Sequence, residues 1–187
     1  QLAAMMVADD AYAGSESFNR LAEAVEEVFN KKHFMPAHQG RAAEHIISQV
    51  FVQKDGVVPM NFHFTTTKAH IEYAGGTVLE VFMDDALEIK SSKPFKGNID
   101  IDKLKAAVKL HGKEKIPYIR LEAGTNLIGG QPFSIENMRE VRKVADENGL
   151  IIVLDVSLVG ENVYFNKMRE PEFKDKSVKE IMHTMCD

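Results

Sequence analysis

The most constraining feature of the sequence is an almost unbroken apolar run from Leu150 to Val156, which reads LIIVLDV. The residues before it, Asn148 and Gly149, are typical of a turn that ends a helix. A short strand that is apolar on both faces is typical of a parallel sheet covered by helices on each side. The run therefore predicts an α/β fold, with Asp155 at the carboxyl end of a buried strand.

Helical and strand patterns alternate along the rest of the chain. Apolar residues at helical spacing predict helices over residues 18–29, 41–52, 69–74, 102–110, 134–147 and 177–185. Short apolar segments predict strands over residues 57–64, 78–83, 116–123 and 150–156, and residues 84–100 are expected to be a surface loop. This alternation predicts a three-layer α/β/α domain with a mostly parallel sheet.

Composition and net charge argue against several classes of protein. The chain has 187 residues, 44% of them hydrophobic and 27% charged, which is enough to bury the core of one domain. The net charge of −5 argues against nucleic-acid binding. No apolar stretch approaches the roughly 18 residues of a membrane span. The single cysteine, Cys186, excludes an intramolecular disulfide framework, so a reducing cytoplasm is the simplest compartment.

Three candidate site residues follow predicted strands, where ligands of open parallel sheets bind. Phe64 could stack on a planar ring or belong to the core. Asn126 could be a site amide or part of a plain loop. Asp155 could be a metal ligand, a partner for a cationic group, or the cap of a following helix. The seven histidines are scattered without metal-ligand spacing.

A fourth candidate is the segment Gln39, Gly40 and Arg41, which directly precedes a predicted helix. Free N–H groups at a helix start, a glycine that allows close approach, and an arginine together suit a phosphate. The alternative is a glycine turn followed by a solvated arginine. A phosphate site, an aromatic plate, an amide and a carboxylate form the set that pyridoxal phosphate needs. In that set the acid holds the ring nitrogen protonated, and the ring becomes an electron sink.

Six longer motifs occur in order: DDAYAGSESF, HQGRAAE, FTTTKAH, PFKGNIDIDKL, GTNLIGGQPFSIENMR and ENVYFNKMRE. In order and spacing they resemble the tyrosine phenol-lyase and tryptophanase family of beta-eliminating lyases, from about residue 8 to residue 185. The resemblance implies pyridoxal 5′-phosphate as cofactor and the large-domain fold of aspartate aminotransferase, called fold type I. It also implies cleavage of an aromatic amino acid to phenol or indole, pyruvate and ammonia.

The resemblance also implies residue roles. Phe64 stacks on the cofactor ring, Asn126 meets the phenolic oxygen and Asp155 the ring nitrogen. The cofactor phosphate is bound by Gln39, Gly40 and Arg41.

Three further residues match family positions around the substrate. Tyr12 matches a tyrosine that reaches into the active site across a subunit boundary. Asp10 falls where the family carries a glutamate that helps to bind a monovalent cation such as potassium, and aspartate is shorter. Thr65 matches the branch that cleaves tyrosine, because tryptophanases have an aspartate there.

Two departures from the family pattern are visible. Leu158 stands where the family has an arginine that contacts the cofactor. The Schiff-base lysine of the family belongs beyond Asp187, so residues 1–187 are expected to form part of the large cofactor domain, without that lysine and without the small C-terminal domain.

Two functions remain open at this stage. The first is a carbon–carbon lyase of aromatic amino acids, present as a fragment that forms a homo-oligomer or pairs with a complementing C-terminal chain. The alternative is a catalytically inactive truncated relative that acts only as a folded, self-associating or partner-binding domain.

Overall fold

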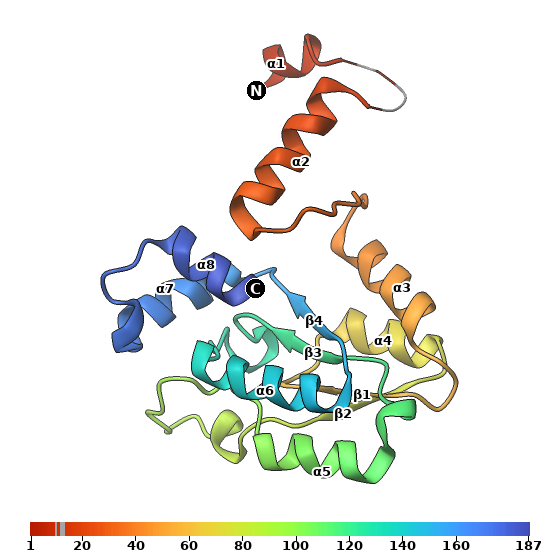
Figure 1. Cartoon of the computed structure of the whole chain (residues 1–187), viewed down its shortest axis with the longest axis vertical. Helices are drawn as coiled ribbons and strands as arrows, with labels where there is room; N and C mark the ends of the chain where they lie inside the picture. The colour runs from red at the N-terminus through yellow and green to blue at the C-terminus, as the bar shows by residue number, and fades with distance from the viewer. Residues whose placement is uncertain (10, 12–13) are drawn as a thin grey trace.

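The fold is built on a four-stranded sheet in which all neighbouring strands are parallel (Figure 1). The computed structural model describes residues 1–9, 11 and 14–187. The strands run in the order β2-β1-β3-β4. Their bounds are β1 Val57–Met60, β2 Thr77–Glu80, β3 Ile119–Glu122 and β4 Ile152–Asp155. The predicted parallel sheet is therefore confirmed, and Asp155 lies at a carboxyl end. The predicted full burial of its strand is wrong, because β4 is an edge strand and its residues are only partly buried.

The order of the strands places a crevice between β1 and β3. From β1 the chain moves outward to β2 on one side, and it later continues with β3 and β4 on the other side. Crossover connections leave in opposite directions at such a point, and ligands of open α/β sheets bind at the carboxyl ends of the strands there. Phe64 follows β1 and Asn126 follows β3, so both lie at this crevice.

Helices cover both faces of the sheet (Figure 1). One face carries α3 and α4, and the other carries α5, α6, α7 and α8. Two further helices, α1 and α2, extend away from the sheet, and the end of α2 rests on α8. The helix bounds are α1 Leu2–Met6, α2 Glu16–Phe29, α3 Gly40–Phe51, α4 Thr65–Tyr73, α5 Ile101–His111, α6 Ile135–Asn148, α7 Val159–Arg169 and α8 Val178–Cys186. Short 3-10 turns occupy Asp84–Leu87, Lys113–Lys115, Asn126–Ile128 and Pro171–Phe173.

Alternation along β3 separates the two cores. Ile119 and Leu121 are fully buried in the larger core, against α5 to α8. Tyr118 belongs to the smaller core under α3 and α4, and Arg120 and Glu122 share its face because side chains alternate along a strand. The face that carries α3 and α4 therefore receives a charged pair next to the crevice.

Several helix ends follow from capping residues. The Ser134 hydroxyl accepts from the backbone N–H of Asn137, and Ser177 forms a capping box with Glu180. Gly149 ends α6 in the left-handed conformation, with φ of 64°.

The structure corrects several element predictions. The strands are shorter than predicted, and residues 61–64 lead from β1 into α4. Helix α4 begins at Thr65, four residues before the predicted start at residue 69, and its N-cap is Phe64. Helix α7 was not predicted, because its buried face contains Asn162 and Asn166, which interrupt the apolar stripe. Helix α1 was also not predicted. No helix in the described part of the chain is long and apolar enough to cross a membrane.

Candidate functional site

A cavity of about 720 Å³ opens at the carboxyl ends of the strands, between the sheet and helices α3 and α4. All six residues that the sequence analysis assigned to the cofactor line it: Gln39, Gly40, Arg41, Phe64, Asn126 and Asp155. They come from the α3 start, the segment after β1, the loop after β3 and the end of β4. Their roles as cofactor ligands stay predictions, but the fold brings all of them to one space.

The other three candidates are not placed at the cavity. Thr65 is exposed at the first position of α4, and its neighbours Thr66 and Thr67 line the cavity instead. Asp10 and Tyr12 lie outside the described residues.

The start of α3 forms one end of the cavity. Gln39 is the N-cap in extended conformation, and its side chain makes no capping hydrogen bond. A methyl group added to Gly40 would meet no atom within 4 Å, so the backbone there borders open space. Arg41 follows as an exposed cation on the first turn. The helix start therefore keeps the N–H groups and the positive charge that an anion needs.

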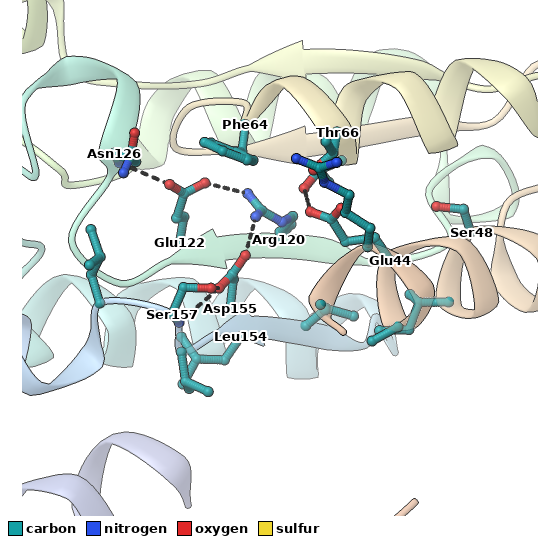
Figure 2. Close-up of a pocket in the computed structure, with 18 of the residues that line it drawn as sticks. Glu44, Ser48, Phe64, Thr66, Arg120, Glu122, Asn126, Leu154, Asp155 and Ser157 are labelled. Atoms are coloured by element: carbon teal, nitrogen blue, oxygen red, sulfur yellow. Dashed lines mark hydrogen bonds and ion pairs between the residues drawn. The ribbon is translucent and has the colours of Figure 1, made fainter. Parts of the chain in front are cut away.

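Asp155 forms the opposite wall of the cavity, where both of its carboxylate oxygens have partners (Figure 2). Oδ1 accepts from the Ser157 backbone N–H at 2.9 Å and from the Ser157 hydroxyl at 2.6 Å. Oδ2 accepts from Nη2 of Arg120 at 2.6 Å. Burial alone would raise the pKa of Asp155, but the Ser157 hydrogen bonds and the Arg120 charge outweigh it and lower this pKa. Asp155 does not cap α7, whose N-cap is Leu158.

Arg120 and Glu122 are the site residues that sequence reasoning missed. Nη1 of Arg120 donates to Oε2 of Glu122 at 2.9 Å, and the two side chains are only 3% and 5% exposed. The signal was present in the sequence, because two charged residues alternate with apolar ones inside a predicted buried strand (IRLE). Charged residues are almost never fully buried without a partner, so this pattern predicts a buried ion pair.

Asn126 contacts this network through its backbone. Its N–H donates to Oε1 of Glu122 at 2.9 Å. Within the described part of the chain its side-chain amide makes no hydrogen bond, and the residue is exposed. The Phe64 ring is half-buried beside the cavity and belongs to neither core cluster. In Figure 2 the Phe64 ring and Asp155 are drawn on opposite sides of the Arg120–Glu122 pair.

A buried asparagine fixes the crevice between β1 and β3. Asn61, directly after β1, is 1% exposed. Its Nδ2 donates to Gly97 O, Glu122 O and Thr125 Oγ1, each at 3.0 Å. Its Oδ1 accepts from the Glu122 N–H at 3.0 Å. These bonds extend the contact of the two strands beyond their single register pair, Met60 with Arg120.

Leu158 packs against the loop after β3. Gly124 has φ of +66°, and a Cβ there would lie 2.7 Å from Cβ of Leu158. The contact leaves no room for a larger residue at position 124. Leu158 also lines the cavity, so an apolar side chain stands where the family pattern has an arginine.

The described residues contain no group of three or more histidine, cysteine, aspartate or glutamate side chains that could hold a metal ion. Asp155 is paired instead with the guanidinium of Arg120, at 2.6 Å.

Comparison with known proteins decides the family. A sequence model described as beta-eliminating lyase matches residues 1–187. The tyrosine phenol-lyase of Symbiobacterium thermophilum is 46% identical over 185 residues, and that of Nostoc punctiforme is 40% identical over 186 residues. The chain belongs to the beta-eliminating lyase family.

The two alignments cover 99% and 100% of this chain but only 40% of each relative, so the chain spans about two fifths of their length. The family resemblance seen in the sequence motifs is confirmed.

Solved structures show that this beta-eliminating lyase chain has the fold of pyridoxal-phosphate transferases. An aspartate aminotransferase from Rhizobium meliloti matches with a TM-score of 0.61 at 11% identity, covering 79% of this chain and 35% of that one. A PLP-bound C-S lyase from Staphylococcus hominis matches with a TM-score of 0.56 at 14% identity, covering 75% and 34%. The expected fold type I architecture is thereby confirmed.

Proposed function

We propose that this chain supplies the cofactor-binding part of a pyridoxal-phosphate-dependent carbon–carbon lyase that acts on an aromatic amino acid. The observation that carries the proposal is the common cavity of the α3 start, Phe64, Asn126 and Asp155. Relatives named tyrosine phenol-lyase, 40 to 46% identical to the chain, support the reaction class.

The residues fit the cofactor at both ends. The open space beside Gly40 and the free start of α3 accept a phosphate, and Arg41 adds a cation. At the other end, Asp155 is held as a carboxylate and pairs with a cationic ring nitrogen. In the same cavity, Phe64 offers an aromatic face and Asn126 an unpaired amide within the described part of the chain. When bound, the cofactor supplies an electron sink for the carbanion that the reaction creates.

The lining of the cavity bears on how the cofactor is held. The residues that line it in the described part of the chain include no lysine. We therefore propose that these residues bind the cofactor without a covalent bond. Borohydride treatment followed by intact-mass measurement checks this, and a stable adduct on one specific lysine of this chain would contradict it.

Replacement of Arg41 tests the proposed phosphate site. Loss of one charged hydrogen bond costs about 1.5–3 kcal/mol, so Arg41→Ala should weaken pyridoxal-phosphate binding about ten- to hundredfold. Equilibrium titration by absorbance measures the change. Arg20→Ala, on the exposed face of α2, is the matched control and should bind as the unmodified protein does. Equal affinities for both variants would refute the phosphate assignment, and no saturable binding by the unmodified protein would refute the proposed function.

Three residues extend the proposal to the substrate, on the family resemblance alone. Thr65 favours tyrosine over tryptophan, Tyr12 contributes to catalysis across a subunit boundary, and Asp10 helps to bind a monovalent cation such as potassium. The domain assignment is also a proposal: residues 1–187 form part of the large domain.

A second candidate function, a self-associating domain without chemistry, is favoured by the N-terminal arm of α1 and α2 (Figure 1). Apolar side chains of the arm are exposed, although α2 contacts α8 at its end. They are Leu2, Met5, Met6, Val7, Phe18, Leu21 and Val28. Exposed apolar surface of this kind marks an interaction site.

We expect the protein to associate with a second copy through this arm. Sedimentation at tens of micromolar, a concentration on the order of typical interface strengths, should show a dimer or larger species. Leu21→Glu, which places a charge on the arm, should shift the protein toward the monomer. Glu23→Gln, on the same helix, is the control. A monomer for the unmodified protein would rule out self-association at this strength.

A further inference from the structure

Arg120 joins two carboxylates at the wall of the cavity. Its Nη2 binds Asp155 and its Nη1 binds Glu122, at 2.6 Å and 2.9 Å. The arginine and Glu122 are almost fully buried, whereas the Asp155 side chain is 21% exposed toward the cavity. All three residues line the cavity, but only Asp155 has much exposed surface with which to meet a ligand (Figure 2).

The formal charges of the three groups do not cancel. Two carboxylates and one guanidinium leave one net negative charge in a largely buried position. Other ionisable groups that line the cavity are Arg41 and Glu44 on α3 and Tyr118 before β3, whose pKa is raised by burial so that its phenol stays neutral. Helix α4 contributes only Thr66 and Thr67 to the lining. The formal charges of Glu44 and Arg41 cancel. The net negative charge of Asp155, Arg120 and Glu122 therefore remains.

We infer that Glu122 and Arg120 are positioning residues for Asp155: Arg120 orients the carboxylate, and Glu122 neutralises Arg120 so that the three groups together keep one net negative charge for a cationic ring nitrogen. The inference rests on the proposed function and assigns two residues to it. Without Glu122, Arg120 and Asp155 would form a neutral pair with much less attraction for a cation. With Glu122, the same arginine fixes the carboxylate without cancelling its charge.

The arrangement also explains why a buried arginine is tolerated at this place. A lone buried charge is costly, and each partner here satisfies part of the guanidinium. Glu122 is itself held by the Asn126 N–H at 2.9 Å, so the unit is anchored to the loop after β3. The carboxylate of Asp155 is held from its other side by Ser157. The geometry therefore fixes Asp155 from both directions.

The test measures the protonation of a bound ring nitrogen. The probe is 4′-deoxypyridoxine 5′-phosphate with a ¹⁵N-labelled ring, which has the phosphate and the ring but no aldehyde. Its ¹⁵N chemical shift reports whether the bound ring nitrogen carries a proton, and a pH series gives its pKa. In Glu122→Gln this pKa should fall by about one unit, the usual size for loss of one nearby buried charge.

Two controls separate this effect from a structural one. Glu170→Gln makes the same change at a half-buried carboxylate that binds the start of α6, and it should leave the ring-nitrogen pKa unchanged. Asp155→Asn should lower this pKa further than Glu122→Gln does, because the carboxylate that lines the cavity is then itself lost. Circular dichroism confirms that each variant is folded.

The outcomes are distinguishable. If the probe binds and Glu122→Gln lowers its affinity equally at every pH without moving the pKa, the inference is overturned and the proposed function stands. The same holds if Asp155→Asn leaves this pKa unchanged. If the unmodified protein does not bind the probe, both are overturned.

Discussion

Asn61→Leu should destabilise the protein more than most single substitutions in the chain. The side chain is 1% exposed and is bonded to backbone groups of Gly97 and Glu122 and to Thr125. Leucine has a similar volume but leaves Gly97 O and the Glu122 N–H without partners, at a cost of about 1–3 kcal/mol for each. Thr125 Oγ1 and Glu122 O keep their hydrogen bond to each other. We expect a total loss of about 3–5 kcal/mol, a large part of the 5–15 kcal/mol typical of a domain.

Urea denaturation followed by circular dichroism measures this loss. Asn19→Leu, on the exposed surface of α2, is the control and should change the free energy of unfolding little. Because Asn61 joins β1 to the end of β3, the variant should also lose binding of 4′-deoxypyridoxine 5′-phosphate. A loss of stability no greater than that of the control would show that the β1–β3 crevice is held by other contacts.

The sequence predicted those features of the fold that depend on apolar patterning. The run LIIVLDV predicted a parallel sheet because its apolar residues suit both faces of a strand covered by helices, although β4 is a partly buried edge strand. The same reasoning failed for α7, whose buried face relies on Asn162 and Asn166. Asn162 accepts from the N–H groups of Gly124 and Phe133. A polar side chain that satisfies buried backbone groups looks like a surface residue until its partners are known.

The residues of the candidate site also divide into those that a local sequence pattern predicts and those whose role depends on distant partners. Its outer residues, such as Gly40 and Asp155, follow strands or precede helices, and local signals found them. Arg120 escaped notice because its importance depends on a partner 35 positions away, at the end of a neighbouring strand. Strand order is a property of the whole sheet, and no local pattern in the chain specifies that β3 lies next to β4.

Arg120→Met should lower stability at neutral pH and reverse its dependence on pH. Removal of one partner from a buried ion pair leaves an uncompensated charge and costs about 3–5 kcal/mol. In this variant the Asp155 and Glu122 carboxylates stay near each other without the cation. Methionine has an unbranched apolar side chain that fills much of the same space, so the loss of stability should come mainly from removal of the Arg120 charge.

The direction in which the free energy of unfolding changes with pH follows from the pKa of Asp155. In the unmodified protein this pKa is lowered, so its contribution to stability is full above the unfolded value of about 3.9 and is lost as pH falls through the folded value. In Arg120→Met the Ser157 hydrogen bonds remain, but we expect desolvation and repulsion from Glu122 to outweigh them without the cation and to raise the pKa of Asp155 above the unfolded value. The folded state then binds the extra proton, so the free energy of unfolding of the variant increases as pH falls from 7 toward 5.

Urea denaturation at pH 7, 6 and 5 distinguishes the pH dependence of stability in the variant from that in the unmodified protein. Arg139→Met is the matched control, because Arg139 pairs with Glu172 through two hydrogen bonds, at 2.7 Å and 2.8 Å, on the exposed surface. Solvent screens that pair, so its loss should change stability little at any of these pH values. If Arg120→Met lost the same free energy at pH 5 as at pH 7, the arginine would act through packing. A deficit that shrinks toward pH 5 would instead show that its charge is what keeps Asp155 ionised at the wall of the cavity.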